Sequence, residues 1–339
     1  MPSQPAIPPL LSPYVTSLPQ SSLTVLSSVL DATGNWLVLR FLHAALSASQ
    51  GSVAFGSDGV EGQKKRKVVL GLDLARLTDK GQFAFVDGLS ELLYTPTPTR
   101  ASPIPPPSPS PSAIPSRTVL PLRSAPGAVP GRVPQPLSRP SPAVSNTIPT
   151  TSENTSTTRL HFSGNGVPAL DAIERDIAGV IGHLKTPKAG DEEEAEVLLI
   201  LDQPDLLLAA TGPNRGIGAT EIGDWIMGLQ QHAYATVLTL AADSPLIHNA
   251  SASAPQSATP LEVEHAAFAI ESAHRAEIVM QLRSLETGAA RDVSGVLRIS
   301  KGGAWGRGDR ANVEGVWEEK EVLYFIQRDG GVRLFGRGE

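Results

Sequence analysis

The feature that most limits how this chain folds is a proline-rich segment between residues 95 and 150. It contains 17 prolines, five arginines and no acidic residue. Proline has no backbone N–H and a fixed φ, so such a segment does not suit the interior of a helix or sheet. It also has no aromatic residue, and it cannot offset an ordering entropy of about 1–2 kcal/mol per residue. We therefore predict a disordered Pro/Ser/Arg insertion over residues 95–158.

The segments on both sides of this insertion carry the pattern of an α/β domain. An apolar run at 23–30 is followed by a turn and by helical spacing from Trp36 to Leu46, which predicts strand, turn and helix. After the insertion, the pattern predicts helices at 167–184, 219–233 and 261–275 and strands at 197–202, 234–242, 276–285 and 292–300, with a hairpin around Asp329-Gly330-Gly331. Such alternation predicts a three-layer domain with a mostly parallel central sheet and C-terminal antiparallel strands.

These patterns divide the chain into four parts. Residues 1–20 are expected to form a flexible tail, 21–94 the first part of the domain, 95–158 the insertion and 159–339 the second part. Within the first part, Phe83, Phe85 and Val86 suit a further buried strand. The apolar run 197–202 ends in Asp202, a pattern typical of a strand buried on both faces.

Composition excludes several classes of chemistry. The chain has no cysteine, which excludes disulfides, thiol nucleophiles and iron–sulfur clusters. Its seven histidines show no paired metal-ligand spacing, so we expect neither a metal nor a cofactor. Outside residues 95–150 the formal charge is 23 − 34 = −11, which argues against a broad nucleic-acid-binding face. No apolar run approaches the ~20 residues of a membrane helix, and we expect a soluble intracellular protein with no membrane contact.

The first strand, turn and helix occupy the place where a nucleotide-binding protein would carry a P-loop. That motif needs glycines for close approach to phosphates, a lysine for the β- and γ-phosphates and a Ser or Thr for Mg²⁺. Here Gly34 is kept, but Asn35 and Trp36 stand where the lysine and the hydroxyl would be. A buried tryptophan stabilises a core by roughly 4–6 kcal/mol, so Trp36 is expected to pack rather than to bind phosphate.

Two further motifs resemble nucleotide sites. The strand ending in Asp202 is similar to a Walker B strand, whose aspartate helps position Mg²⁺, although many buried parallel strands end in this way. Gly164, Gly166 and Ala169 match G-x-G-x-x-A, for which a turn opening a helix is the simpler interpretation. The basic run 64–67 is compatible with a nuclear-import signal or with the start of an exposed strand.

Several strings, taken in order, resemble one known family. They are DATGNWLVLRFL, GLDLARLTDKGQFAFVDGLSELL and VLLILDQPDLLLAATG, followed near the C-terminus by VMQLRSLETGAARDVSGVLRIS and EVLYFIQRDGGVRLFGRG. Their order is similar to that in the sixth subunit of the Elongator complex, in a divergent fungal-type version. The resemblance covers residues 20–95 and 159–338, and the long insertion after Leu93 departs from it.

The resemblance implies a RecA-like domain without an intact nucleotide site and without enzymatic activity of its own. It also implies assembly with the fourth and fifth Elongator subunits into a hetero-hexameric ring, association with the remaining subunits, and a cytoplasmic and nuclear location. The ring would bind tRNA in an ATP-sensitive way and support wobble-uridine modification of tRNA by the catalytic subunits.

Polar residues near the ends of the strands are the candidates for tRNA contact. Loop 243–260 follows a core strand where RecA-like rings send loops toward the pore, which makes Ser244, His248 and Asn249 candidates together with Arg215. Two other functions remain open. The chain could be a P-loop-type ATPase with a degenerate site, or an adaptor whose basic proline-rich segment recruits SH3- or WW-type partners.

Overall fold

The computed structural model describes residues 7–48, 68–69, 72–93, 157–186, 194–211, 215–247, 258–285, 290–306 and 317–336. The helices are α1 Ser12–Val15, α2 Asn35–Ala48, α3 Leu74–Asp79, α4 Val167–Lys185, α5 Leu206–Thr211, α6 Ala219–His232, α7 Ser244–Ile247 and α8 Pro260–Arg275. The strands are β1 Ser22–Ser28, β2 Val68–Val69, β3 Leu72–Asp73, β4 Val86–Asp87, β5 Thr158–Arg159, β6 Leu198–Leu201, β7 Ala235–Ala241, β8 Ile278–Arg283, β9 Gly295–Lys301, β10 Lys320–Ile326 and β11 Val332–Phe335.

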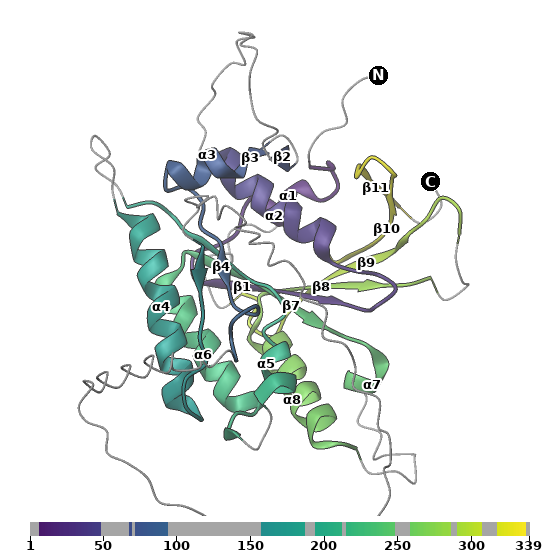
Figure 1. The fold of residues 1–339 in the computed structure, drawn as a ribbon. Coiled ribbons are helices and arrows are strands. Elements are labelled where there is room, and N and C mark those ends of the chain that lie inside the picture. The colour runs from purple at the N-terminus through teal and green to yellow at the C-terminus, as the bar shows by residue number, and fades with distance from the viewer. Residues whose placement is uncertain are drawn as a thin grey trace, which may run out of the picture. The chain divides into compact units, whose positions relative to one another are not determined.

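A seven-stranded sheet organises the described residues, in the order β11-β10-β9-β8-β1-β7-β6 (Figure 1). Strands β6, β7, β1 and β8 are parallel, whereas β9, β10 and β11 continue the sheet in antiparallel pairs. The prediction of an α/β domain with a mostly parallel sheet and C-terminal antiparallel strands is confirmed, and the arrangement is compatible with a RecA-like fold. β1 precedes the insertion in the sequence and lies between two strands that follow it.

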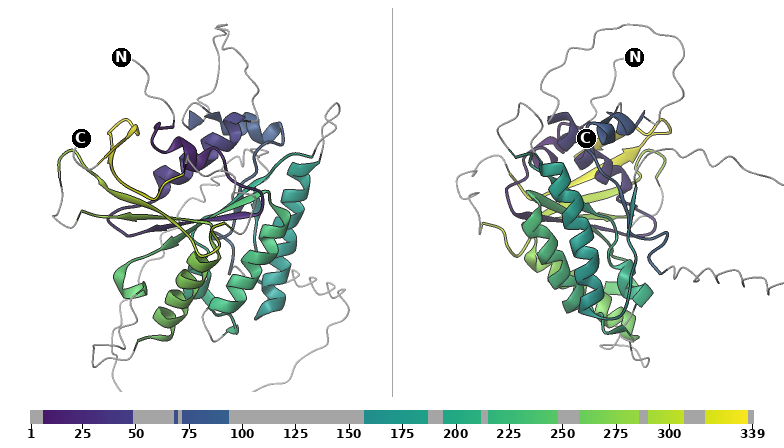
Figure 2. Two further views of the ribbon diagram at one scale, coloured as in Figure 1. Left: turned by 180° about the vertical axis from the view of Figure 1, so that it is seen from behind. Right: turned by 60° about the vertical axis from the view of Figure 1, so that its left-hand side comes forward.

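Helices cover both faces of the sheet (Figure 2). Side chains of α4, α6 and α8 pack with Leu23 and Val25 of β1 in one core, and α1 and α2 pack with Leu26 of β1 in the other. Neighbouring residues of a strand point to opposite faces, which is why Val25 and Leu26 belong to different cores. The structure therefore has the three layers that the sequence predicts.

The helices that border the sheet begin and end as their sequences indicate. Pro168 lies in the first turn of α4, after Gly166 with a φ of 64°, a value that favours glycine. Leu170, Ile173, Ile177 and Ile181 form the buried face of this helix, as expected. At the start of α8, Thr259 and Glu262 form a reciprocal capping box. Among the described residues, no helix has the length and apolar character needed to cross a membrane.

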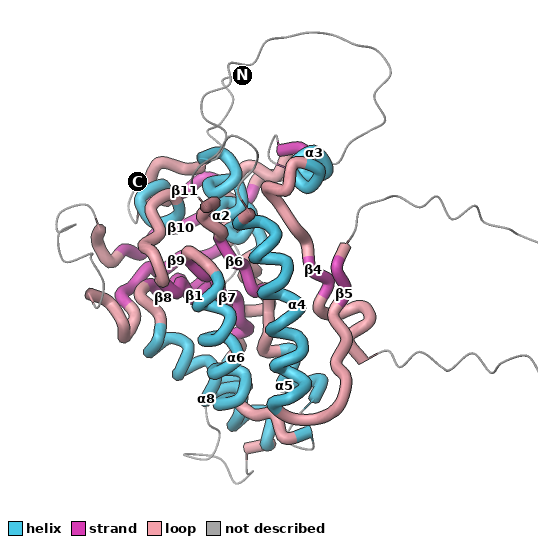
Figure 3. Tube along the Cα trace, turned by 90° about the vertical axis from the view of Figure 1, so that its left-hand side faces the viewer, coloured by secondary structure: helices cyan, strands magenta, loops and turns pink. Residues whose placement is uncertain are grey.

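The prediction of a buried strand at 83–86 is wrong. β4 covers only Val86–Asp87 and pairs only with the two residues of β5, so this small sheet is separate from the main one (Figure 3). Val86 packs against the core, whereas Phe85 is 61% exposed. Since no described element covers the outer face of this strand, only the inward-pointing Val86 is partly buried. The predicted insertion lies outside the described residues up to 156, and Thr158 already belongs to β5.

β6 also differs from its prediction as a strand buried on both faces. It is the last strand of the main sheet among the described residues and pairs only with β7. Leu198, Leu199 and Ile200 are therefore half-buried, and Leu201 alone is fully buried. The C-terminal hairpin agrees with its prediction, since β10 and β11 are joined by a turn in which Gly330 has a φ of 82°.

Candidate functional site

The candidate site is the carboxyl edge of the parallel strands, where the turn after β1 and the residues after β6 and β7 meet. Ligands of open α/β sheets usually bind outside this edge. β7 separates β1 from β6, so at a strand spacing of about 4.8 Å their ends lie roughly 10 Å apart. Gly34, Asn35 and Trp36 approach this edge from β1 and Asp202 approaches it from β6, which is the arrangement that a nucleotide site would need.

Trp36 is part of the hydrophobic core. It is 7% exposed, and its ring centroid lies 5.1 Å from that of Tyr324 on β10, with the planes inclined by 38°. Tyr324 is itself buried, and this burial raises the pKa of its hydroxyl. The residue at the Ser/Thr position of a P-loop therefore packs between α2 and the sheet, in agreement with the expectation from its size.

The turn before α2 is occupied by a protein carboxylate. The backbone N–H of Leu30 donates to Oδ1 of Asp243 over 3.0 Å, and the N–H of Ala242 donates to the carbonyl of Ser28 over 2.7 Å. In a P-loop, the backbone N–H groups of this turn would face phosphate oxygens. Here one of them already has an anionic acceptor, and the negative charge of Asp243 disfavours a phosphate beside it.

The space around residue 34 does not require a glycine. A Cβ built at this position would lie 3.7 Å from Leu282 Cδ1 and 3.7 Å from Ser28 Cβ, which are ordinary contacts. Its φ is not in the left-handed region. The glycine that matches the motif is therefore not held there by backbone conformation or by a close neighbour.

Asp202 is exposed and bonded to the neighbouring strand. Its Oδ1 accepts from Thr239 Oγ1 over 2.7 Å, and the same hydroxyl oxygen accepts from the N–H of Gln203 over 2.8 Å. Gln203 has a φ of 53°, which turns the chain sharply after β6. One carboxylate oxygen of Asp202 thus stabilises the end of the sheet.

A buried acid–base pair lies beside this network. Nε2 of His265 on α8 is 3.1 Å from Oδ2 of Asp205, and the two side chains are 4% and 5% exposed. Asp205 also accepts from the N–H of Ala241 over 3.2 Å, and Nδ1 of His265 lies 3.3 Å from the carbonyl of Leu246. The pair joins the ends of β6 and β7 to α7 and α8, the helices on either side of loop 248–257.

The structure places two of the four candidates for tRNA contact. Ser244 is the first residue of α7 and is exposed, while His248 and Asn249 lie outside the described residues. Arg215 is half-buried, and its guanidinium carbon lies 5.7 Å from the ring centroid of Phe162. The carbonyl of Arg215 accepts from the N–H of Gly166, so this candidate also holds the turn that opens α4.

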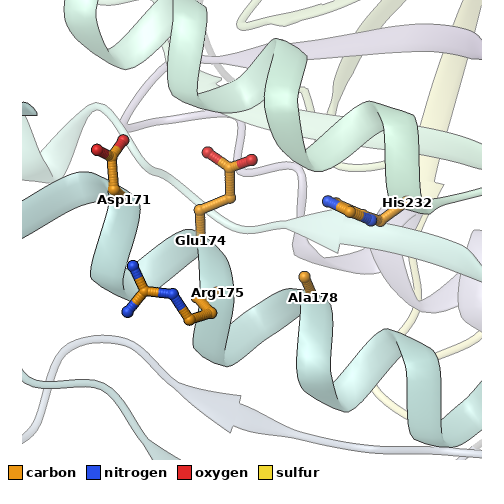
Figure 4. Close-up of a pocket in the computed structure, with 5 residues that line it drawn as sticks. All are labelled: Asp171, Glu174, Arg175, Ala178 and His232. Atoms are coloured by element: carbon orange, nitrogen blue, oxygen red, sulfur yellow. The ribbon is translucent and has the colours of Figure 1, made fainter. Parts of the chain in front are cut away.

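A shallow groove of about 350 Å³ runs between α4 and α6 (Figure 4). It is lined by Asp171, Glu174, Arg175 and Ala178 of α4 and by His232 at the end of α6. The helices approach closely here because Gly228 leaves room for the carboxylate of Glu174. The groove is open and carries both signs of charge. In the described parts of the chain, no three His, Asp or Glu side chains are grouped to hold a metal ion.

The sequence did not predict the roles of Asp205, Thr239 and His265, which form hydrogen bonds at the carboxyl edge. Asp205 follows Asp202 by three positions, and Thr239 interrupts an apolar strand, so both carried a weak local signal. His265 lies on the apolar face of a helix, where its acidic partner is not evident. No protein-family model matches the chain, and no curated protein sequence matches it.

Proposed function

We propose that this protein is a non-catalytic RecA-like subunit of the Elongator complex. In this proposal it assembles with the fourth and fifth subunits into a hetero-hexameric ring that binds tRNA and supports wobble-uridine modification. Support for the family comes from the ordered strings between DATGNWLVLRFL and GVRLFGRG, and support for a non-catalytic role comes from the turn between β1 and α2. A cytoplasmic and nuclear location belongs to the same proposal.

The observation that carries the non-catalytic role is the local chemistry of this turn. Phosphoryl transfer depends on positive charge and N–H donors that stabilise the phosphate oxygens. Here Asn35 supplies no cation, Trp36 is buried against Tyr324, and the N–H of Leu30 donates to Asp243. These features favour a scaffold over an ATPase, even though Asp202 is placed at the edge as a Walker B aspartate would be.

The proposed tRNA contact lies on the loops of the carboxyl edge. Ser244 is exposed on α7, and Arg215, which precedes α6, is half-buried. The guanidinium of an arginine suits phosphate oxygens. The acidic charge outside the insertion limits this contact to a local one.

Binding of tRNA by the co-expressed assembly tests this proposal. The expected result is that Arg215→Ala and Ser244→Ala weaken binding, and that Arg215→Ala reduces the slope of log K against log[salt] by about 0.7–0.9. Arg76→Ala, at an exposed position of α3, is the matched control and leaves binding unchanged. Equal affinity with and without this subunit would contradict the tRNA role, and ATP turnover by the isolated chain that is lost in Asp202→Ala would favour the degenerate ATPase instead.

A further inference from the structure

Arg40 is a buried arginine to which the proposed function gives no role. It lies on α2 among the residues that face the sheet, and it is 4% exposed. An arginine has five N–H donors and remains charged in proteins. Nε of Arg40 has no hydrogen-bond partner, and in the described part of the chain no carboxylate forms an ion pair with this guanidinium.

Two half-buried arginines of the domain, Arg275 and Arg283, are paired with carboxylates, whereas Arg40 is more buried and has no such partner. Arg275 lies 2.6 Å from Glu271 and 3.6 Å from Asp224, and it donates to the carbonyl of Gly223 over 2.9 Å. Arg283 lies 3.0 Å from Glu321. These two side chains are 29% and 27% exposed, so the most buried of the three arginines is the one without a partner.

Among the residues that the structure describes, no acid is paired with Arg40. Helix α2 contains no acidic residue, and the core on its inner side consists of apolar and aromatic side chains. A buried charge without a counter-charge is strongly unfavourable, and arginine does not escape by losing its proton. The positive charge acts on its neighbour, because burial and then the charge of Arg40 lower the pKa of His43, one turn further along the helix.

We propose that Arg40 binds a small oxyanion, a phosphate or carboxylate taken from solution, through its unused N–H groups. A guanidinium matches two oxygens of such a group with parallel hydrogen bonds. Because only 4% of the side chain is exposed, a bound ligand has to be small, and the backbone of a nucleic acid does not qualify. The site lies about five residues into α2, or roughly 7.5 Å along its axis from Asn35, and is separate from the tRNA contact proposed above.

Thermal unfolding of the full chain in inorganic phosphate or acetate tests this site. Wild-type protein is expected to melt at a higher temperature in phosphate than in sodium chloride of equal ionic strength, and Arg40→Met is expected to lose this difference. Arg76→Met, which removes an exposed arginine, should keep the phosphate effect. An equal phosphate effect in Arg40→Met, or none in the wild type with either anion, would overturn the proposal.

Two further measurements separate binding from a purely structural role. Without oxyanions, Arg40→Met should be at least as stable as the wild type, because it keeps the apolar stem and removes an unpaired buried charge. A large loss of stability would mean that the guanidinium is satisfied within the fold, against the proposal. In nuclear magnetic resonance titrations, phosphate should raise the pKa of His43 in the wild type and leave it unchanged in Arg40→Met, since a bound anion offsets the charge that lowers it.

Discussion

The ring of Trp36 lies 5.1 Å from that of Tyr324, and both side chains are buried between α2 and the antiparallel part of the sheet. This contact joins the turn after the first parallel strand to β10, a strand near the end of the chain. The residue that would hold a Mg²⁺-binding hydroxyl in a P-loop protein thus belongs to the core. In a P-loop ATPase this position carries a Ser or Thr that binds Mg²⁺, whereas here it carries a tryptophan that packs in the core.

Replacing Trp36 should affect stability more than any ligand binding. Trp36→Ala is expected to reduce the free energy of unfolding by about 3–5 kcal/mol, because it leaves a large cavity beside Tyr324. Urea unfolding followed by circular dichroism measures this. Leu39→Ala, at a position of the same helix that is 36% exposed, should cost much less. Similar losses for both variants would show that Trp36 is not a core anchor.

Restoring the motif should not restore a nucleotide site. The double variant Asn35→Lys with Trp36→Ser provides the missing cation and hydroxyl, but it removes the core contact and leaves Asp243 bonded to the N–H of Leu30. We expect loss of stability and no ATP turnover, measured by phosphate release. Turnover in this variant would mean that the rest of the site is intact.

Gly34 should tolerate a side chain. Gly34→Ala is expected to change stability by less than about 1 kcal/mol, because its Cβ would meet only ordinary contacts. Gly302→Ala is the matched contrast, since a Cβ there would overlap the backbone carbonyl of Ala276. Melting temperatures of the two variants test the difference. A severe defect in Gly34→Ala would point to a requirement for close approach at the turn.

The buried pair of Asp205 and His265 should be strongly coupled. Removing either partner leaves a buried polar group without its counterpart, so Asp205→Asn and His265→Gln are each expected to cost about 1–3 kcal/mol. The double variant should cost clearly less than the sum, as a double-mutant cycle would show. His274→Gln, on the exposed side of α8, serves as the control. Additive losses would contradict the pairing.

His43 should make the protein less stable in acid. Its pKa is lowered in the folded state by burial and then by the charge of Arg40, so the unfolded chain binds this proton first as the pH falls. The free energy of unfolding therefore decreases as the pH drops through and below about 6.5. His43→Gln should show a smaller decrease between about pH 7 and pH 5, measured from urea midpoints. An identical pH dependence would contradict this contribution.

The insertion should be dispensable for folding. Strands on both sides of it share one sheet, with β1 between β7 and β8. Replacing residues 95–156 with a short Gly/Ser linker keeps β4 and β5 and should leave both stability and assembly with partner subunits intact. Loss of assembly on this deletion would favour the adaptor hypothesis, in which the proline-rich segment recruits the partner.

The elements that the sequence predicted well are those with a periodic pattern and local signals at their ends. α4 is an example, with its apolar face from Leu170 to Ile181 and Pro168 in its first turn. The segment around Phe85 was mispredicted because an apolar residue does not reveal whether a neighbouring strand or helix covers it. For the same reason the sequence of β6 predicts a fully buried strand, although this strand has only one strand neighbour among the described residues.

The hydrogen bonds at the carboxyl edge had only a weak local signal in the sequence. Leu30 and Asp243 are 213 residues apart, Asp205 and His265 are 60 apart, and Asp202 and Thr239 are 37 apart. Hydrogen bonds between residues so distant depend on the order of the strands, which a single sequence does not provide. The absence of a lysine at the position of a P-loop lysine was visible in the sequence, whereas the carboxylate that occupies the turn was not.

We propose that this chain is a scaffold subunit of a RecA-like ring, and the mass of the co-expressed assembly is the sharpest test of this proposal. The protein would be produced together with the fourth and fifth Elongator subunits and analysed by native mass spectrometry. We expect one dominant species with the mass of a hetero-hexamer that contains this chain and gains mass when tRNA is added. If this chain remained a stable monomer when both partners are present, the proposal would be contradicted.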